Sequence, residues 1–160
     1  MGRFFMMGMG DVSLVLGMEA VRDRNSKRVN TSHTNYNKSL QERYEIANGN
    51  PACTPGAGQA LSLDQRRGKI LNEEDKQRYQ PITGSVMYLA RVTRYDIGYG
   101  VNQLARATSK PSKAHVAAAK HLLRYSAGMT DHKITYNQGG FQLTAFSEAN
   151  WGDNPDNGKS

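Results

Sequence analysis

The sequence has little of several features that would assign a protein to a class. It contains a single cysteine, Cys53, so no disulfide can form within the chain and a reducing compartment is the simpler interpretation. No apolar run is long enough to cross a bilayer. The apolar start, MGRFFMMGMG, also lacks the charged region and cleavage site of a signal peptide. These features argue against a disulfide-rich secreted fold and predict no attachment to a membrane.

Motifs for small-ligand or metal chemistry are also missing. The N-terminal glycines match neither dinucleotide-binding nor Walker spacing. The four histidines do not pair with Cys53 at any zinc spacing. The DNPDNG string near the end places Pro155 where a calcium loop requires Asp or Asn. We therefore predict no metal site in this chain.

The chain does carry an excess of positive charge. Its 21 Lys and Arg exceed its 14 Asp and Glu, which gives a net charge of +7 and a pI near 9.6. Such a balance favours polyanionic partners, chiefly nucleic acid, although a merely basic surface is the alternative.

Local patterns predict an α+β fold. Residues 13–34 read as a hairpin with a polar tip at 24–27 and a buried first strand, and residues 36–47 read as a helix. The stretch 48–72 is rich in turn residues and is expected to form a long connecting loop.

The second half predicts three helices followed by a strand, a Gly-Gly turn and another strand. The first helix covers 82–93, and the second begins with Asp96 as its N-cap. The third runs from a Ser112 cap to a stop at Gly128 and is the clearest of the three.

Basic charge is concentrated in these helices, with eight Lys or Arg against two acids between residues 91 and 133. On the third helix, Lys113, Lys120 and Arg124 are spaced to project from one side, away from its apolar stripe. Such a face suits a phosphate backbone, and a solvated helix surface is the alternative. The residues predicted to bind nucleic acid are Arg91, Arg94, Lys113, Lys120 and Arg124.

Four blocks of the sequence together form one pattern of motifs, and in chain order they are MGDVSLVLGMEAVRDR, YQPITGSVMYLARVTRYDIGYGVNQLAR, KPSKAHVAAAKHLLRY and FSEANWGDNPDNGKS. In the same order and with similar spacing, these blocks resemble segments of the Pol polyproteins of copia-type retrotransposons. The last block is similar to the Y-S-D-A-D-W-A-G-D stretch of that family. Together the blocks cover nearly the whole chain.

The resemblance implies the C-terminal part of a reverse transcriptase that runs into the start of an RNase H domain. The implied units are the end of the palm (1–47), a linker (48–78), a helical thumb- or connection-like segment (79–130) and a truncated RNase H start (131–160). Glu148 stands at the position of the first RNase H aspartate, and Asn150 replaces the second acid. The polymerase Y-x-D-D motif is absent from the sequence.

The resemblance further implies that the intact protein uses Mg²⁺ and that this chain binds no cofactor by itself. It implies an RNA–DNA hybrid or template-primer as the partner, together with the remainder of the polyprotein. The expected location is the cytoplasm or a virus-like particle. We expect neither polymerase nor RNase H activity from the chain alone. Two alternatives remain open: a small basic nucleic-acid-binding module without chemistry, and a non-functional remnant of a decayed element.

Overall fold

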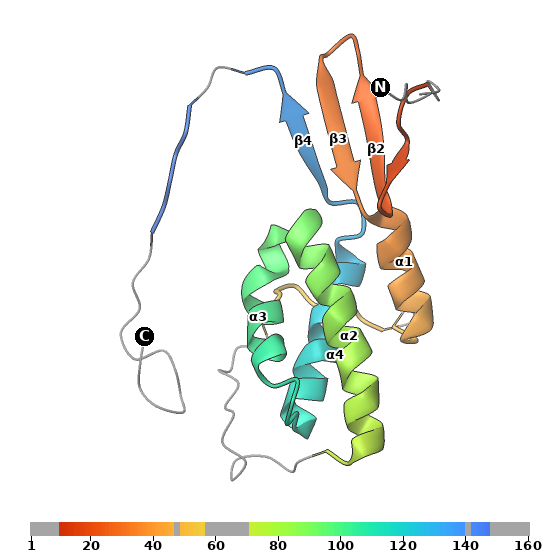
Figure 1. Cartoon of the computed structure of the whole chain (residues 1–160), viewed down its shortest axis with the longest axis vertical. Helices are drawn as coiled ribbons and strands as arrows, with labels where there is room; N and C mark the ends of the chain where they lie inside the picture. The colour runs from red at the N-terminus through yellow and green to blue at the C-terminus, as the bar shows by residue number, and fades with distance from the viewer. Residues whose placement is uncertain (1–9, 47–48, 57–70, 140–141, 148–160) are drawn as a thin grey trace, which may run out of the picture.

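The computed structural model describes residues 10–46, 49–56, 71–139 and 142–147. In this part of the chain an antiparallel sheet stands at one end of a group of helices (Figure 1), which confirms the α+β class. The elements are β1 Leu14–Val15, β2 Met18–Asp23, β3 Arg28–Ser32, α1 Thr34–Arg43, α2 Glu73–Val92, the 3₁₀ turn η2 Tyr95–Ile97, α3 Gly98–Arg106, α4 Lys113–Gly128 and β4 Lys133–Asn137.

The hairpin between β2 and β3 is confirmed, with its tip at residues 24–27. The two strands pair antiparallel, from Glu19 opposite Ser32 to Asp23 opposite Arg28. The Asp23 carboxylate organises the turn because it accepts hydrogen bonds from the backbone N–H groups of Asn25 and Ser26 at 2.9 and 3.1 Å.

The prediction of a buried first strand is wrong. The chain reverses at Leu16 and Gly17, whose φ angles are 50° and 80°, and this turn divides the segment into β1 and β2. Glycine adopts that backbone conformation without steric cost. Leu14 and Leu16 are 63% and 84% exposed, so the apolar run lies on the surface of the sheet.

β4 follows the helices in the chain and completes the sheet beside β3. It pairs antiparallel with β3, with Tyr136 opposite Val29, and gives the strand order β1-β2-β3-β4. The expected strand after the Gly-Gly turn does not form in residues 142–147, where Leu143 and Phe146 are 93% and 94% exposed. Apolar alternation alone does not build a strand when no neighbouring strand pairs with it.

α2 is longer than the sequence indicates and begins inside the range predicted as linker. The Asn72 side chain accepts the backbone N–H of Asp75 at 2.8 Å and caps the helix. Three acidic residues in the first turn complement the helix dipole. Pro81 lies within the helix without ending it. The helical segment therefore starts at Glu73 and not near residue 82.

α4 follows the prediction closely. Its N-terminus is closed by Ser112 and His115, since the ring Nδ1 of His115 accepts the backbone N–H of Ser112 at 3.1 Å. Gly128 is the last residue of α4, as expected, but glycine is needed there mainly because a side chain would not fit. A Cβ at this position would lie 2.8 Å from Cβ of Pro51.

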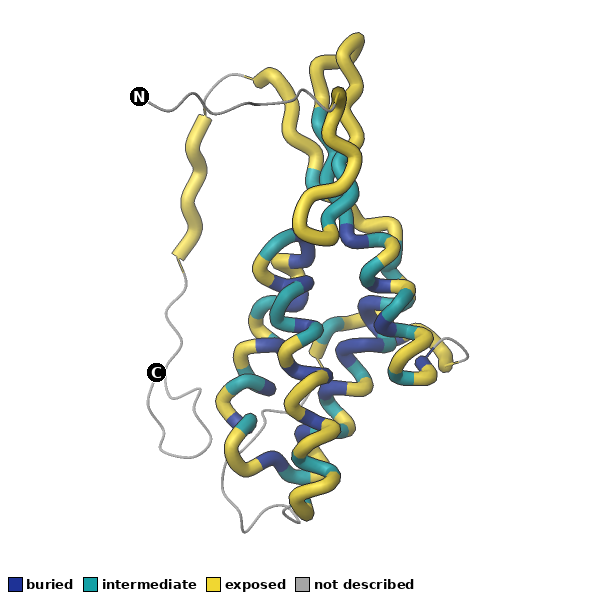
Figure 2. Tube along the Cα trace, turned by 45° about the vertical axis from the view of Figure 1, so that its right-hand side comes forward, coloured by how far each residue is buried: buried dark blue, intermediate teal, exposed yellow. Residues whose placement is uncertain are grey.

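The buried side chains gather among the helices (Figure 2). Leu40 of α1, Val86 and Leu89 of α2, and Leu122 of α4 are almost inaccessible to solvent. Buried polar groups pair across the same interface: the Asn37 amide and Ser126 exchange two hydrogen bonds of 2.8 and 2.9 Å between α1 and α4. The sheet thus rests on a well-packed helical body that holds the surface side chains in place.

Candidate nucleic-acid interface

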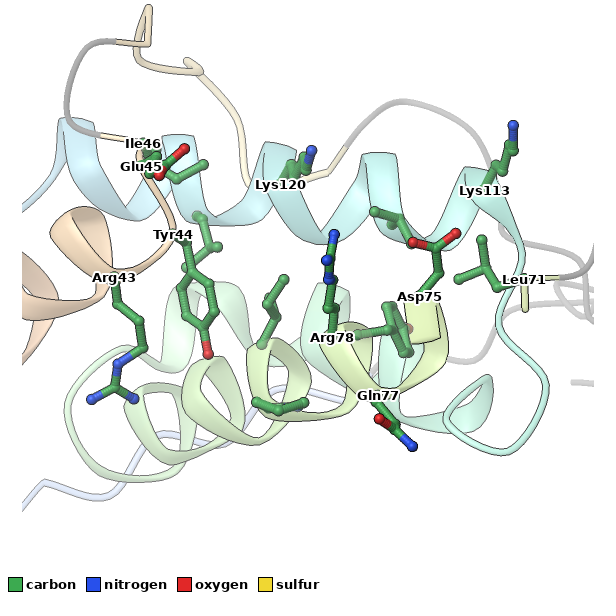
Figure 3. Close-up of a pocket in the computed structure, with 15 residues that line it drawn as sticks. Arg43, Tyr44, Glu45, Ile46, Leu71, Asp75, Gln77, Arg78, Lys113 and Lys120 are labelled. Atoms are coloured by element: carbon green, nitrogen blue, oxygen red, sulfur yellow. The ribbon is translucent and has the colours of Figure 1, made fainter. Parts of the chain in front are cut away.

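A groove of about 800 Å³ runs between the first halves of α2 and α4 and reaches the end of α1. We call it the basic groove. The cationic residues that line it are Arg43, Arg78, Lys113 and Lys120. In Figure 3 the side chains of Lys113 and Lys120 extend on the same side of α4, and that of Arg78 lies between them in this view. Arg43 lies at the α1 end and points away from the other three.

The net charge of the groove lining is positive. Four cations face two acids, Glu45 and Asp75, which leaves 4 − 2 = +2. Arg78 also pairs with Glu74 at 2.8 Å, but both side chains are more than 70% exposed, so this ion pair is weak and can exchange for another anion. Lys113 and Lys120 are exposed and form no ion pair within the described residues.

The floor of the groove is apolar and firmly held. It is formed by residues such as Ile82, Val116 and Leu123, together with Tyr79. The Tyr79 hydroxyl donates to the backbone carbonyl of Leu104 at 2.7 Å, and burial raises the pKa of Tyr79 to about 12. The floor is therefore uncharged, and the cationic residues lie at the rim of the groove.

Two of the five residues predicted to bind nucleic acid, Lys113 and Lys120, are brought together here. Arg124 is not among the groove residues: its Nε donates to the backbone carbonyl of Asn50 at 2.9 Å, which ties residues 49–56 to α4. His121 makes a similar contact, with Nε2 2.9 Å from the Thr54 carbonyl oxygen. Arg91 is exposed in the last turn of α2 but does not line the groove.

Arg94 requires a correction, because it is not on an exposed face. Its side chain is 3% exposed. The guanidinium makes a two-pronged contact with the Asp96 carboxylate, with distances of 2.9 Å from Nε and 2.8 Å from Nη2. Nη1 donates to the Met129 carbonyl at 3.0 Å, and the group stacks 5.5 Å from the ring centre of Tyr125. Arg94 therefore joins η2 to the end of α4 and is unavailable to a phosphate.

The same pair corrects the prediction for Asp96. This carboxylate does not cap α3, whose N-cap is Ile97, because it is engaged by Arg94. Partial burial raises the pKa of Asp96, but hydrogen bonds and charge from Arg94 outweigh this and hold the pKa below its usual value. The neighbouring Thr93 lies 2.7 Å from Nδ1 of the buried His33. The T-R-Y-D segment is thus a structural junction.

Arg43 and Arg78 are groove residues that the sequence did not reveal. Arg43 ends α1, and Arg78 fell in the range read as linker. The Asn72 cap followed by three acids was the signal that would have placed Arg78 on a helix. No local signal indicates that the end of α1 approaches α2 and α4, because this contact is tertiary.

Within the described ranges, no three His, Cys, Asp or Glu side chains are grouped closely enough to hold a metal ion. Glu148, predicted at the first RNase H carboxylate position, lies outside the described residues. None of the helices in the described part has the length and hydropathy that a membrane span requires.

Comparison with known proteins places this arrangement in a family. The chain is 32% identical over 161 residues to the retrovirus-related Pol polyprotein from transposon TNT 1-94 of Nicotiana tabacum, a match that covers 98% of this chain and 12% of the relative. It is 35% identical to the corresponding polyproteins from transposons RE2 and RE1 of Arabidopsis thaliana, over 91% and 96% of this chain and 10% of each relative. The chain thus spans about a tenth of the length of these relatives.

No family model and no solved structure matches the chain. The three polyproteins nevertheless match over 91–98% of its length, as the four sequence blocks predict. The chain therefore belongs to the retrovirus-related Pol polyproteins of copia-type transposons, of which it spans one segment.

Proposed function

We propose that this segment helps to hold the RNA–DNA hybrid or template-primer during reverse transcription by its parent polyprotein. The observation that carries the proposal is the basic groove, where Lys113 and Lys120 of α4 and Arg78 of α2 line one pocket with an apolar floor. The names of the relatives, which are Pol polyproteins, support a protein that handles nucleic acid.

The spacing of the two lysines suits a phosphate backbone. Seven residues separate Lys113 from Lys120, which corresponds to about 10 Å along a helix. The strand of a duplex winds around its axis, so consecutive phosphates lie farther apart than the axial rise of about 3.4 Å, and the two ammonium groups can contact different phosphates of one strand. Lysine ammonium groups act as point charges and contact phosphates without reading bases. The proposed grip is therefore independent of sequence.

The catalytic steps of the parent protein are not assigned to the described residues. In the intact polyprotein, Mg²⁺ would serve the polymerase and RNase H reactions, and carboxylates would hold it. Glu148 is proposed as one such carboxylate on the family resemblance. The proposed contribution of this segment is binding, in the cytoplasm or in a virus-like particle.

The test is a titration of a fluorescent RNA–DNA hybrid at several salt concentrations with the wild type and with Lys113→Gln/Lys120→Gln. Glutamine matches lysine in helix propensity, so the helix should remain intact. The variant should bind more weakly, and the slope of log K against log salt should fall by about 2, close to one unit per lost phosphate contact.

The matched control is Lys38→Gln/Lys133→Gln, which removes the same charge from exposed positions outside the groove. If the control lowers affinity and slope as much as the groove variant, only net charge matters and the groove is not the site. A wild type that binds no hybrid at low salt despite a cooperative melt would refute the proposal. A broad, non-cooperative melt would instead favour the decayed-remnant alternative.

A further inference from the structure

A second cluster of cations lies at the tip of the β2–β3 hairpin. In Figure 1 this tip is the end of the sheet that is farthest from the helices. We call it the basic tip. It consists of Arg22, Arg24, Lys27 and Arg28, which together with Val29 and Gln138 line a depression of about 490 Å³. All four cations are exposed. None of them is among the residues predicted from the sequence to bind nucleic acid.

The acids at the tip neutralise it only in part, because Asp11 and Asp23 are outnumbered by the four cations. Asp23 accepts hydrogen bonds from Ser26 Oγ at 2.6 Å and from two backbone N–H groups, and these bonds, with the charge of Arg28, hold the pKa of its carboxyl below the usual value. The Asp23 carboxylate is thus charged and engaged in the turn. Asp11 pairs with Arg24 at 2.6 Å, but both side chains are 64% exposed and the pair is readily exchanged. Arg22, Lys27 and Arg28 form no ion pair within the described residues.

The fold sets the distance between the tip and the groove. β3 leads from the tip directly into α1, both run in the same direction in Figure 1, and Arg43 at the end of α1 lines the groove. Five strand residues at about 3.3 Å and ten helical residues at about 1.5 Å place Arg43, at the α1 end of the groove, roughly 30 Å from the tip, and Lys113 at the start of α4 lies farther away. The tip is thus separated from the near end of the groove by about one turn of a double helix, about 34 Å.

We propose that the basic tip is a second phosphate-binding site and that the tip and the groove, whose near end lies about one helical turn away, contact one duplex. The same strand returns to the same side of a duplex after one turn, so cations at the tip and at the near end of the groove can contact one side of the duplex without bending it. The connection between β3 and α1 is held by the Glu19 carboxylate of β2, which accepts the backbone N–H groups of Thr34 and Asn35 at 3.0 and 2.9 Å. The two-site arrangement rests on the proposed function of the groove, whereas phosphate binding at the tip does not.

The chemistry of the tip favours nucleic acid over a lipid surface. Residues 24–27 in the turn are all polar, so no apolar side chain there can enter a bilayer. Interfacial membrane binding combines cations with Trp, Phe or Leu. Arginines, which are three of the four cations, present a fork of donors that matches phosphate oxygens.

The test compares 8- and 16-base-pair duplexes, since only the longer one reaches both sites. The tip variant is Arg22→Gln/Lys27→Asn, which removes two cations that lack an ion pair in the described residues. Asparagine is chosen at Lys27 because the φ of 52° there is one that asparagine tolerates well. Binding is measured by fluorescence anisotropy, alongside Lys113→Gln/Lys120→Gln and Lys38→Gln/Lys133→Gln.

For the wild type we expect the 16-mer to bind at least about tenfold more tightly than the 8-mer, because the second contact forms within the complex. The tip variant should lose this length advantage, and Lys38→Gln/Lys133→Gln should keep it. If the tip variant keeps the advantage, the tip proposal is refuted whatever the groove variant does. If the tip variant binds both duplexes weakly and the groove variant matches the wild type, the groove function fails and the tip survives as the phosphate site.

Vesicles of 30% phosphatidylserine form a further arm at the same salt concentrations. We expect no binding to them that depends on the tip. Vesicle binding that is lost in the tip variant, without any effect of that variant on duplexes, would overturn the proposal in favour of a membrane contact. The thermal melt of each variant is compared with that of the wild type, so a loss of binding is credited to the site only when the melt is unchanged.

Discussion

Replacing Arg94 by methionine should destabilise the fold by about 3 kcal/mol. The change keeps most of the aliphatic stem and removes the guanidinium, which is 3% exposed and contacts Asp96, Met129 and Tyr125. Removing one partner of a buried ion pair typically costs about 3–5 kcal/mol, and the lower end applies because the Asp96 side chain is 34% exposed. A loss of this size is a large fraction of the stability of a small domain.

The measurement is urea unfolding followed by circular dichroism, with Arg91→Met as the matched control. Arg91 is an exposed arginine only three residues away, at the end of α2, so its replacement should change the free energy of unfolding by no more than about 0.5 kcal/mol. Hybrid binding by Arg94→Met, measured well below its melting temperature, should equal that of the wild type. The structural role of Arg94 is refuted if both variants are equally mild, or if Arg94→Met loses binding with an unchanged melt.

The difference between wild type and Arg94→Met should also depend on pH in a defined direction. The folded-state pKa of Asp96 lies below its ordinary value of 3.8, so the unfolded state takes up the proton first as the pH falls. The stabilisation is therefore fully present above about pH 4 and is lost as the pH drops through the folded-state pKa. The difference in stability should therefore shrink as the pH is lowered from pH 6 towards pH 2.5, while the part due to Met129 and Tyr125 remains. A constant difference would show that the carboxylate is not the partner.

Two further substitutions test other junctions of the fold. Glu19→Gln should cost about 1 kcal/mol at neutral pH, because the Glu19 carboxylate on β2 accepts the backbone N–H groups of Thr34 and Asn35 at 3.0 and 2.9 Å and so caps α1. Burial raises the pKa of Glu19, but the hydrogen bonds to the carboxylate outweigh burial and hold the pKa below its usual value. In urea melts the cost of the substitution should therefore shrink as the pH falls below about 4.5, and a cost that grows would contradict the assignment. Gly128→Ala should destabilise the protein, since the new methyl group would lie 2.8 Å from Cβ of Pro51. Gly84→Ala, in open space within α2, should stabilise it by up to about 1 kcal/mol. Equal shifts in melting temperature for the two variants would show that residues 49–56 do not pack on α4.

Local sequence patterns predicted the hairpin tip and α4, because residues close in sequence specify both. The tip at residues 24–27 follows from turn-forming residues between two strands, and α4 follows from its Ser112 start and apolar stripe. The sequence pattern did not predict the start of α2, although its Asn72 cap is a local signal, because the linker was predicted to continue to residue 78. The buried first strand failed because an apolar run does not state what will cover it; here Gly17 turns the chain and leaves Leu14 and Leu16 exposed.

The residues of the candidate site likewise fall into those that local spacing predicts and those that tertiary contacts determine. Lys113 and Lys120 were found because a helix places residues seven apart on one side, which sequence spacing alone determines. Arg94 was misplaced because charge alone does not show whether a side chain meets solvent or an internal partner. Its burial depends on Asp96, Tyr125 and Met129 arriving together from η2 and the end of α4.

The family, the α+β class and the excess of positive charge follow from the amino-acid sequence alone, because each depends on residue identity and order along the chain. Which cations face solvent and which form internal contacts depends on the tertiary structure. It brought Arg43 and Arg78 to the lysines of α4, enclosed Arg94, and set the basic tip one strand and one helix away from the basic groove. Contacts between segments far apart in sequence arise from packing the whole chain, and no local spacing encodes them.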